Sequence, residues 1–202
     1  MPLLFVRNVA PDVALGMWKI EESVDAFFYD YQRLERMKPV SSVIKSEQRR
    51  REVLAVRLLI DRMLGPNAGL RHNADGKPFL DNGMNIGISH TKGYAAVIIS
   101  PRMNVAVDVE YLSGRVERIA GKFLRHDENA VTLVEKLLHW CAKETLYKIC
   151  SDEHLALADM RVLSVEGGDA SGYVVIKNVQ RGETLNVFYN VYDDLVLTYA
   201  AL

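Results

Sequence analysis

The sequence feature that most constrains the fold is a long stretch of helical periodicity between about Glu128 and Cys150. Apolar residues recur there at steps of three and four, namely Val131, Val134, Leu137, Leu138, Cys141, Leu146 and Ile149. On a helix, Trp140, Glu144 and Lys148 follow one another at intervals of four and form one ridge on a single face. A Glu-Lys pair at this spacing is also an ordinary stabilising ion pair, so the ridge alone fits a solvated face equally well.

An apolar run upstream carries two further carboxylates. Residues 105–110 read Val-Ala-Val-Asp-Val-Glu, which predicts a buried strand with Asp108 and Glu110 on the same face. Two like charges side by side are costly to bury unless a cation lies between them, and carboxylate oxygens suit Mg²⁺. If Glu144 projects onto the end of this strand, the three acids form a metal site with Lys148 one turn away. A solvent-exposed strand end without metal is the alternative that the Asp-x-Glu pair leaves open.

The remaining elements alternate between helix and sheet. The patterns predict a strand at 3–9, helices at 21–37 and 46–64, a hairpin within 73–83, strands ending near 88–93 and covering 94–100, and strands at 160–165, 173–177, 185–189 and 195–201. Turn residues between the last four runs favour an antiparallel meander. Both halves of the chain therefore offer helices together with sheet, and an extended segment near 100–108 could join two lobes.

Two polar loops and a group of arginines are candidates for phosphate binding. Lys77 precedes Pro78 and should be held extended, and His90 follows Ser89 at a strand end, where binding groups tend to lie. The first turn of the second helix holds Arg49, Arg50 and Arg51, and Arg33 and Arg36 lie on the helix before it. Guanidinium groups can fork around phosphate oxygens. A solvated, glutamate-balanced helix face and an ordinary turn histidine are the simpler interpretations.

A second basic segment lies between Leu112 and His126. Arg115, Arg118, Lys122 and Arg125 share one side of a predicted helix there, while Phe123 and Leu124 add apolar surface. Such a stripe is usually only solvated, but it could instead dock an acidic partner.

Composition excludes several classes of protein. The net charge of −1 over 202 residues argues against a general nucleic-acid binder. No apolar run approaches the ~20 residues that span a bilayer, and the first residues lack the pattern of a secretory signal. Cys141 and Cys150 both fall on the predicted helix, roughly 13 Å apart, too far for a disulfide. We therefore expect a cytoplasmic protein that binds neither nucleic acid nor membrane.

Four motifs, taken in order, resemble those of the 4′-phosphopantetheinyl transferases. They are Gly76-Lys77-Pro78, Ile88-Ser89-His90-Thr91, Val107-Asp108-Val109-Glu110 and Trp140-x-x-Lys143-Glu144-x-x-x-Lys148. Their order and spacing are similar to those of the larger, pseudo-dimeric (Sfp-like) branch. Ala106, Gly87 and Thr145 depart from the residues common in the family, but none of them removes a charge or a metal ligand.

The resemblance implies an α+β fold of two similar lobes, residues 1–103 and 104–202. Each lobe would be a small antiparallel sheet packed on a long helix, with the active site between the lobes. It also implies a monomer and a reaction. Coenzyme A gives its 4′-phosphopantetheine arm to a serine of an apo acyl or peptidyl carrier protein, and adenosine 3′,5′-bisphosphate is released.

The resemblance also assigns roles to individual residues. Asp108, Glu110 and Glu144 would hold Mg²⁺, or Mn²⁺, on the pyrophosphate, with Lys148 neutralising charge and Glu144 as our hypothesis for the general base. The coenzyme A contacts would be Arg49, Lys77, Pro78, Ser89, His90 and Lys148, assisted by Arg33 and Arg36. The acidic carrier would face Arg115, Arg118, Lys122, Phe123 and Arg125.

Two other functions compete with this interpretation. A non-catalytic module that binds coenzyme A would keep Arg49, Lys77 and His90 but would not need three acids. A metal-dependent nuclease can also use an Asp-x-Glu pair with a helical Glu and Lys, although the near-neutral net charge speaks against it.

Overall fold

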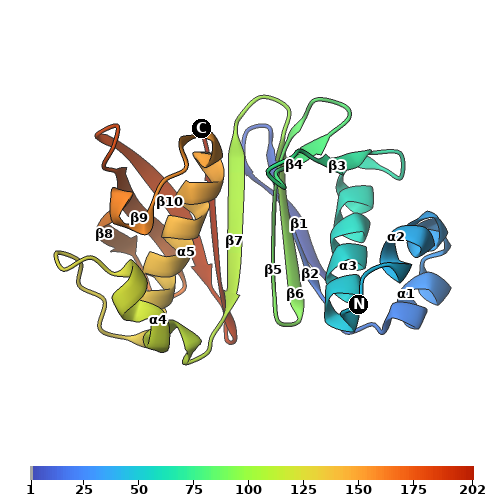
Figure 1. Cartoon of the computed structure of the whole chain (residues 1–202), viewed down its shortest axis with the longest axis horizontal. Coiled ribbons are helices and arrows are strands. Elements are labelled where there is room, and N and C mark those ends of the chain that lie inside the picture. The colour runs from blue at the N-terminus through green and yellow to red at the C-terminus, as the bar shows by residue number, and fades with distance from the viewer. Residues whose placement is uncertain (1) are drawn as a thin grey trace. The chain divides into compact units, whose positions relative to one another are not determined.

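The computed structural model describes residues 2–202 and has an α+β fold in which the paired strands are antiparallel (Figure 1). The chain divides into two compact units, Met1–Met103 and Asn104–Leu202. Each unit has its own hydrophobic core, so each is described by itself.

Unit 1 is built on a four-stranded sheet with the order β1-β2-β6-β5. Its strands are β1 (Leu3–Ala10), β2 (Val13–Lys19), β5 (Asn85–Thr91) and β6 (Tyr94–Ser100). Its helices are α1 (Val24–Asp30), a 3₁₀ helix (Gln32–Met37), α2 (Lys38–Ser42) and α3 (Glu47–Leu64). A separate short hairpin consists of β3 (Leu70–His72) and β4 (Pro78–Leu80).

The ends of α3 are those that the sequence predicts. The Ser46 hydroxyl accepts a hydrogen bond from the Arg49 backbone N–H at 3.3 Å, and Gly65 ends the helix at a φ of +86°. Between them, Leu54, Leu58 and other apolar side chains of α3 are buried in the core of unit 1. That core also holds side chains of β2 and β6, so the helix covers one face of the sheet.

Two predictions for unit 1 need correction. The single helix expected at 21–37 is interrupted, because α1 ends at Asp30 and Tyr31 takes non-helical angles (φ −128°, ψ 76°) before the 3₁₀ helix begins. Strand β2 was not predicted, although its residues are almost all buried. The chain turns at Asp12, whose φ of +60° suits a tight turn from β1 into β2.

Unit 2 is built on a five-stranded sheet with the order β7-β11-β10-β9-β8. Its strands are β7 (Val105–Tyr111), β8 (Met160–Gly167), β9 (Ser171–Asn178), β10 (Glu183–Val191) and β11 (Leu195–Ala201). Its helices are α4 (Arg115–Phe123), α5 (Leu133–Ile149) and the 3₁₀ turns Ser151–Glu153 and Leu157–Asp159. Strands β8 to β11 pair in sequence order, which confirms the predicted meander.

Helix α5 begins five residues later than the periodicity suggests. Thr132 and Glu135 form a reciprocal capping box at its start. Glu128 lies outside the helix, and its fully buried carboxylate accepts from Lys143 Nζ at 2.7 Å and from the Val162 N–H at 2.6 Å. The segment before α5 is therefore fixed to both helix and sheet by this ion pair.

Within residues 2–202, no helix is long and apolar enough to cross a membrane. Cys141 and Cys150 are both free thiols.

A buried ion cluster joins the helices of unit 1. The Asp61 carboxylate is fully buried and lies 2.9 Å from Arg36 Nη2, 2.9 Å from Arg57 Nη2 and 4.0 Å from Arg33 Nε. Arg36 and Arg57 also donate to the Pro66 carbonyl. One carboxylate on α3 thus holds guanidinium groups from the 3₁₀ helix and from α3 itself.

We expect Asp61→Asn to lower the free energy of unfolding by about 3 kcal/mol or more, because it leaves the buried Arg57 guanidinium without its counter-charge. Urea unfolding followed by Trp18 fluorescence in a Trp140→Phe background would measure this for unit 1. The exposed Asp30→Asn is the matched control. Equal stability of the two variants would contradict the structural role of Asp61.

Candidate functional site

The predicted carboxylates of unit 2 lie where strand β7 faces helix α5. Asp108 is buried on β7, and its Oδ1 lies 2.7 Å from Lys148 Nζ of α5. The same ammonium group donates to the Val107 carbonyl at 2.9 Å. Lys148 therefore bridges helix and strand and neutralises one of the carboxylates.

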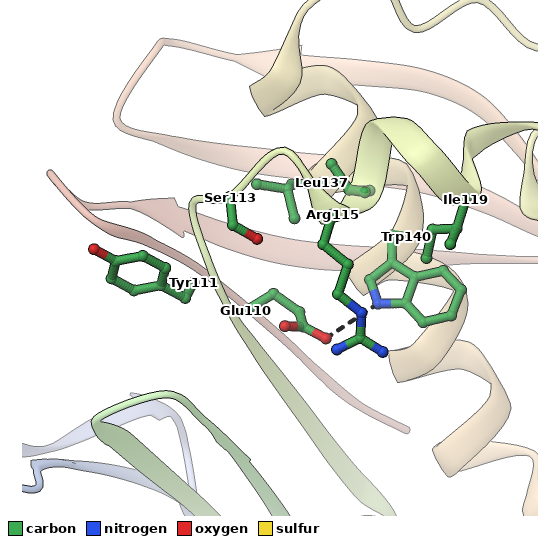
Figure 2. A pocket seen from close by; sticks show the side chains of 8 residues that line it. Glu110, Tyr111, Ser113, Arg115, Ile119, Leu137 and Trp140 are labelled. Carbon is green, nitrogen blue, oxygen red and sulfur yellow. Dashed lines mark hydrogen bonds between the residues drawn. The ribbon is translucent and has the colours of Figure 1, made fainter.

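Glu110 is held by the aromatic residue of the same helical ridge (Figure 2). The Trp140 indole N–H donates to Glu110 Oε1 at 3.3 Å, and the Trp140 ring packs edge-on against Phe123 at 5.3 Å between centroids. Arg115 reaches from the start of α4 toward Glu110 and Trp140, and these residues line a small cavity with Ser113. The carboxylate of Glu110 is thus oriented by the hydrogen bond from Trp140.

Glu144 completes the group of acids. Its side chain is half-buried on α5, and burial raises the pKa of its carboxyl. The Asp108 carboxylate raises this pKa further and Glu110 adds to the effect, whereas Lys148 lowers it. The negative charges of both β7 acids therefore act on Glu144, and a cation nearby would stabilise its ionised carboxylate.

The donor set fits a hard divalent cation. All three acids offer oxygen ligands, and Mg²⁺ usually takes one or two protein carboxylates and completes its shell with water and phosphate oxygens. As the side chains stand, no group of three or more His, Cys, Asp or Glu within residues 2–202 could hold a metal ion. Asp108 is engaged by Lys148 and Glu110 by Trp140, so metal binding would require these contacts to be shared or exchanged.

Unit 1 contains a cavity of about 380 Å³ beside α3. Three of the predicted coenzyme A contacts, Arg49, Pro78 and His90, line it. The other lining residues are Met37, Val40, Glu52, Val53, Val56, Arg57, Leu70, His72, Gly76 and Ile88. Apolar walls with a few cationic groups among them suit a ligand that carries both a flat ring and phosphate groups.

Sequence reasoning missed Glu52, which links two of these residues. Its Oε2 accepts from Arg49 Nη1 at 3.3 Å and lies 3.2 Å from His90 Nδ1. The sequence interpretation counted Glu52 as a counter-charge on a solvated helix face, whereas its side chain is only 8% exposed. The position of Glu52 three residues after Arg49 was a usable signal, but the contact with His90 of β5 was not visible in the sequence.

The other predicted coenzyme A contacts lie elsewhere in unit 1. Lys77 precedes β4 and is half-buried beside Pro78, outside the set of cavity-lining residues. Ser89 is buried on β5, and because side chains alternate along a strand it points away from the face that carries His90. Arg33 and Arg36 are bound to Asp61 rather than placed at the cavity.

The predicted docking stripe is only partly present. Arg115, Arg118 and Lys122 are exposed on α4. The prediction that Phe123 contacts a partner is wrong, because its side chain is 2% exposed and packs on Trp140. Arg125 lies beyond the end of α4, and its guanidinium is bound to Asp127 at 3.0 Å and to the Ala158 carbonyl, so it does not share the helix face.

We expect Glu144→Gln to stabilise the metal-free protein at pH 8. A raised pKa in the folded state means that ionising Glu144 disfavours folding, an effect that grows as the pH rises above the unfolded-state value. The variant should therefore unfold at a higher temperature than the wild type in EDTA at pH 8, and the difference should shrink toward pH 4. A difference independent of pH would show that packing, not charge, is responsible.

Comparison with known proteins gives no family to which the chain can be assigned. No protein-family model matches it, and no curated protein matches it. A function must therefore be inferred from the two groups of residues just described.

Proposed function

We propose that this protein is a 4′-phosphopantetheinyl transferase that uses coenzyme A to modify a serine of an apo carrier protein. The observation that carries the proposal is the meeting of β7 and α5. Asp108 lies 2.7 Å from Lys148, and Glu144 on the same helix senses the charges of Asp108 and Glu110. Three acids and a lysine in this arrangement suit a metal-bound diphosphate better than a structural ion pair, which would need only one acid.

The architecture supports the same proposal. Each unit has an antiparallel sheet and one long helix, α3 of 18 residues and α5 of 17 residues. We take the two units as related lobes of a pseudo-dimeric transferase fold. The boundary between Met103 and Asn104 comes just before β7. The strand that carries Asp108 and Glu110 is therefore the first strand of the second lobe.

In the proposed complex, unit 1 binds the nucleotide end of coenzyme A. Pro78 and the apolar walls of the cavity receive the adenine, and Lys77 flanks it. Arg49 and His90, which line the cavity, bind phosphate oxygens. Arg33 and Arg36 pair with Asp61 and are not among the residues that line this cavity.

Unit 2 supplies the chemistry. Asp108, Glu110 and Glu144 would hold Mg²⁺ or Mn²⁺, which supplies charge neutralisation at the diphosphate when bound. Glu144 accepts the proton of the carrier serine, directly or through water, and the serine oxygen forms a bond to the β-phosphorus. The bond from that phosphorus to the bridging oxygen breaks, and Lys148 stabilises the charge on the departing adenosine 3′,5′-bisphosphate.

The test is intact-mass spectrometry of a panel of apo carrier proteins incubated with the protein, coenzyme A and Mg²⁺. We expect a phosphopantetheine mass increment that disappears with EDTA and falls at least about 100-fold in rate with Asp108→Ala. The exposed Asp169→Ala should keep the wild-type rate. Calorimetric binding of coenzyme A without any increment would support a binding module instead, and the absence of both would refute the proposal.

Carrier docking on α4 gives a separate prediction. Reversing the charges of Arg118 and Lys122 to Glu should raise the KM for an acidic carrier about tenfold at low salt and less at high salt, because the contacts are exposed and screened. The KM for coenzyme A should stay constant. Lys45→Glu, an exposed reversal in unit 1, is the control, and an equal effect of that variant would argue against a docking site on α4.

A further inference from the structure

Glu52 is an acid inside a cavity that, on the proposed function, must receive phosphates. Its side chain is 8% exposed, on the second turn of α3. Gln48 Nε2 donates to Oε1 at 3.0 Å. The other carboxylate oxygen, Oε2, accepts from Arg49 at 3.3 Å and lies 3.2 Å from His90 Nδ1.

The negative charge of Glu52 carries two energetic penalties in this cavity. A buried carboxylate is costly without partners, and it repels any phosphate that enters the same cavity. Arg49 and His90 offset both penalties, because each places a nitrogen on the same carboxylate oxygen. The carboxylate is thereby screened by the two groups that a phosphate would contact.

The contact with His90 also fixes the orientation of its ring. A carboxylate near Nδ1 favours a proton on that nitrogen and leaves Nε2 available to a second partner. In this structure Nε2 meets the Arg49 guanidinium, so the two phosphate-binding groups converge on one point. A phosphate oxygen arriving at this point can receive a hydrogen bond from Arg49 and, from a protonated ring, one from His90.

We propose that Glu52 is a positioning residue for the phosphates of coenzyme A. It holds Arg49 and His90 through a single oxygen, so that both reach the same phosphate group. This inference rests on the proposed function for the identity of the ligand. The arrangement of Glu52, Arg49 and His90 is independent of it.

A positioning role differs from a purely structural one in what it affects. If Glu52 only stabilised α3, its loss would lower stability and leave the affinity of the folded protein unchanged. If it acts through His90, its removal weakens phosphate binding, and the effect depends on the presence of His90.

The first experiment is calorimetric titration with adenosine 3′,5′-bisphosphate, which needs no carrier protein and no turnover. Glu52→Gln keeps the shape of the side chain and removes its charge, and we expect about a tenfold weaker Kd. In a His90→Gln background the same substitution should weaken binding by clearly less than tenfold, because only the contact with Arg49 is then left to lose. Glu47→Gln, exposed on the first turn of the same helix, should bind as the wild type does. Equal Kd values for Glu52→Gln and the wild type would overturn the inference.

The second experiment tests the contact without any ligand. Nitrogen-detected or long-range proton–nitrogen NMR spectra of the His90 ring should show the proton held on Nδ1 in the wild type and redistributed in Glu52→Gln. If the wild type fails to bind adenosine 3′,5′-bisphosphate, the proposed function falls, while these spectra still decide whether Glu52 holds His90. Identical ring spectra in the two proteins would refute the positioning role.

Discussion

The position of α5 on its sheet is the constraint on which the unit 2 site depends. Apolar packing alone would let a helix slide or rotate on a sheet, whereas buried polar contacts specify one position. The Thr145 hydroxyl lies 2.8 Å from that of Thr198 on β11, and Thr198 donates to the Cys141 carbonyl at 3.1 Å. The fully buried Lys143–Glu128 pair fixes the helix on another side. Glu144 and Lys148 are therefore presented to β7 from a helix that has one register.

This constraint gives a reason for a departure noted in the sequence. Thr145 stands where the resembling family commonly has alanine or serine, and its hydroxyl would be costly to bury without a partner. Thr198 is that partner, and both side chains are fully buried. The two residues are far apart in sequence, so their pairing could not be predicted from either one alone.

Elements whose formation depends on residues close in sequence were predicted from the sequence. The helix at 46–64, the α5 ridge and the last four strands follow from periodicity, which is readable in short windows. The same signals indicated helices together with sheet in both halves, and the resemblance implied the α+β class. What the sequence did not show depends on distant partners: the capture of Arg36 by Asp61, 25 residues away, and the burial of Phe123 under Trp140. In both cases a residue that looked available for a ligand is engaged by the fold itself.

The two groups of site residues have opposite charge balances. At the cavity of unit 1, Arg49 and His90 share the single carboxylate of Glu52, so the group favours an anion when the His90 ring is protonated. On β7 and α5, Lys148 pairs with Asp108, while Glu144 carries a pKa raised by burial and by the charges of Asp108 and Glu110, so the group favours a cation. The stability of the fold does not require the charged side chains of either group, because neutral side chains of similar size would pack at least as well at these positions.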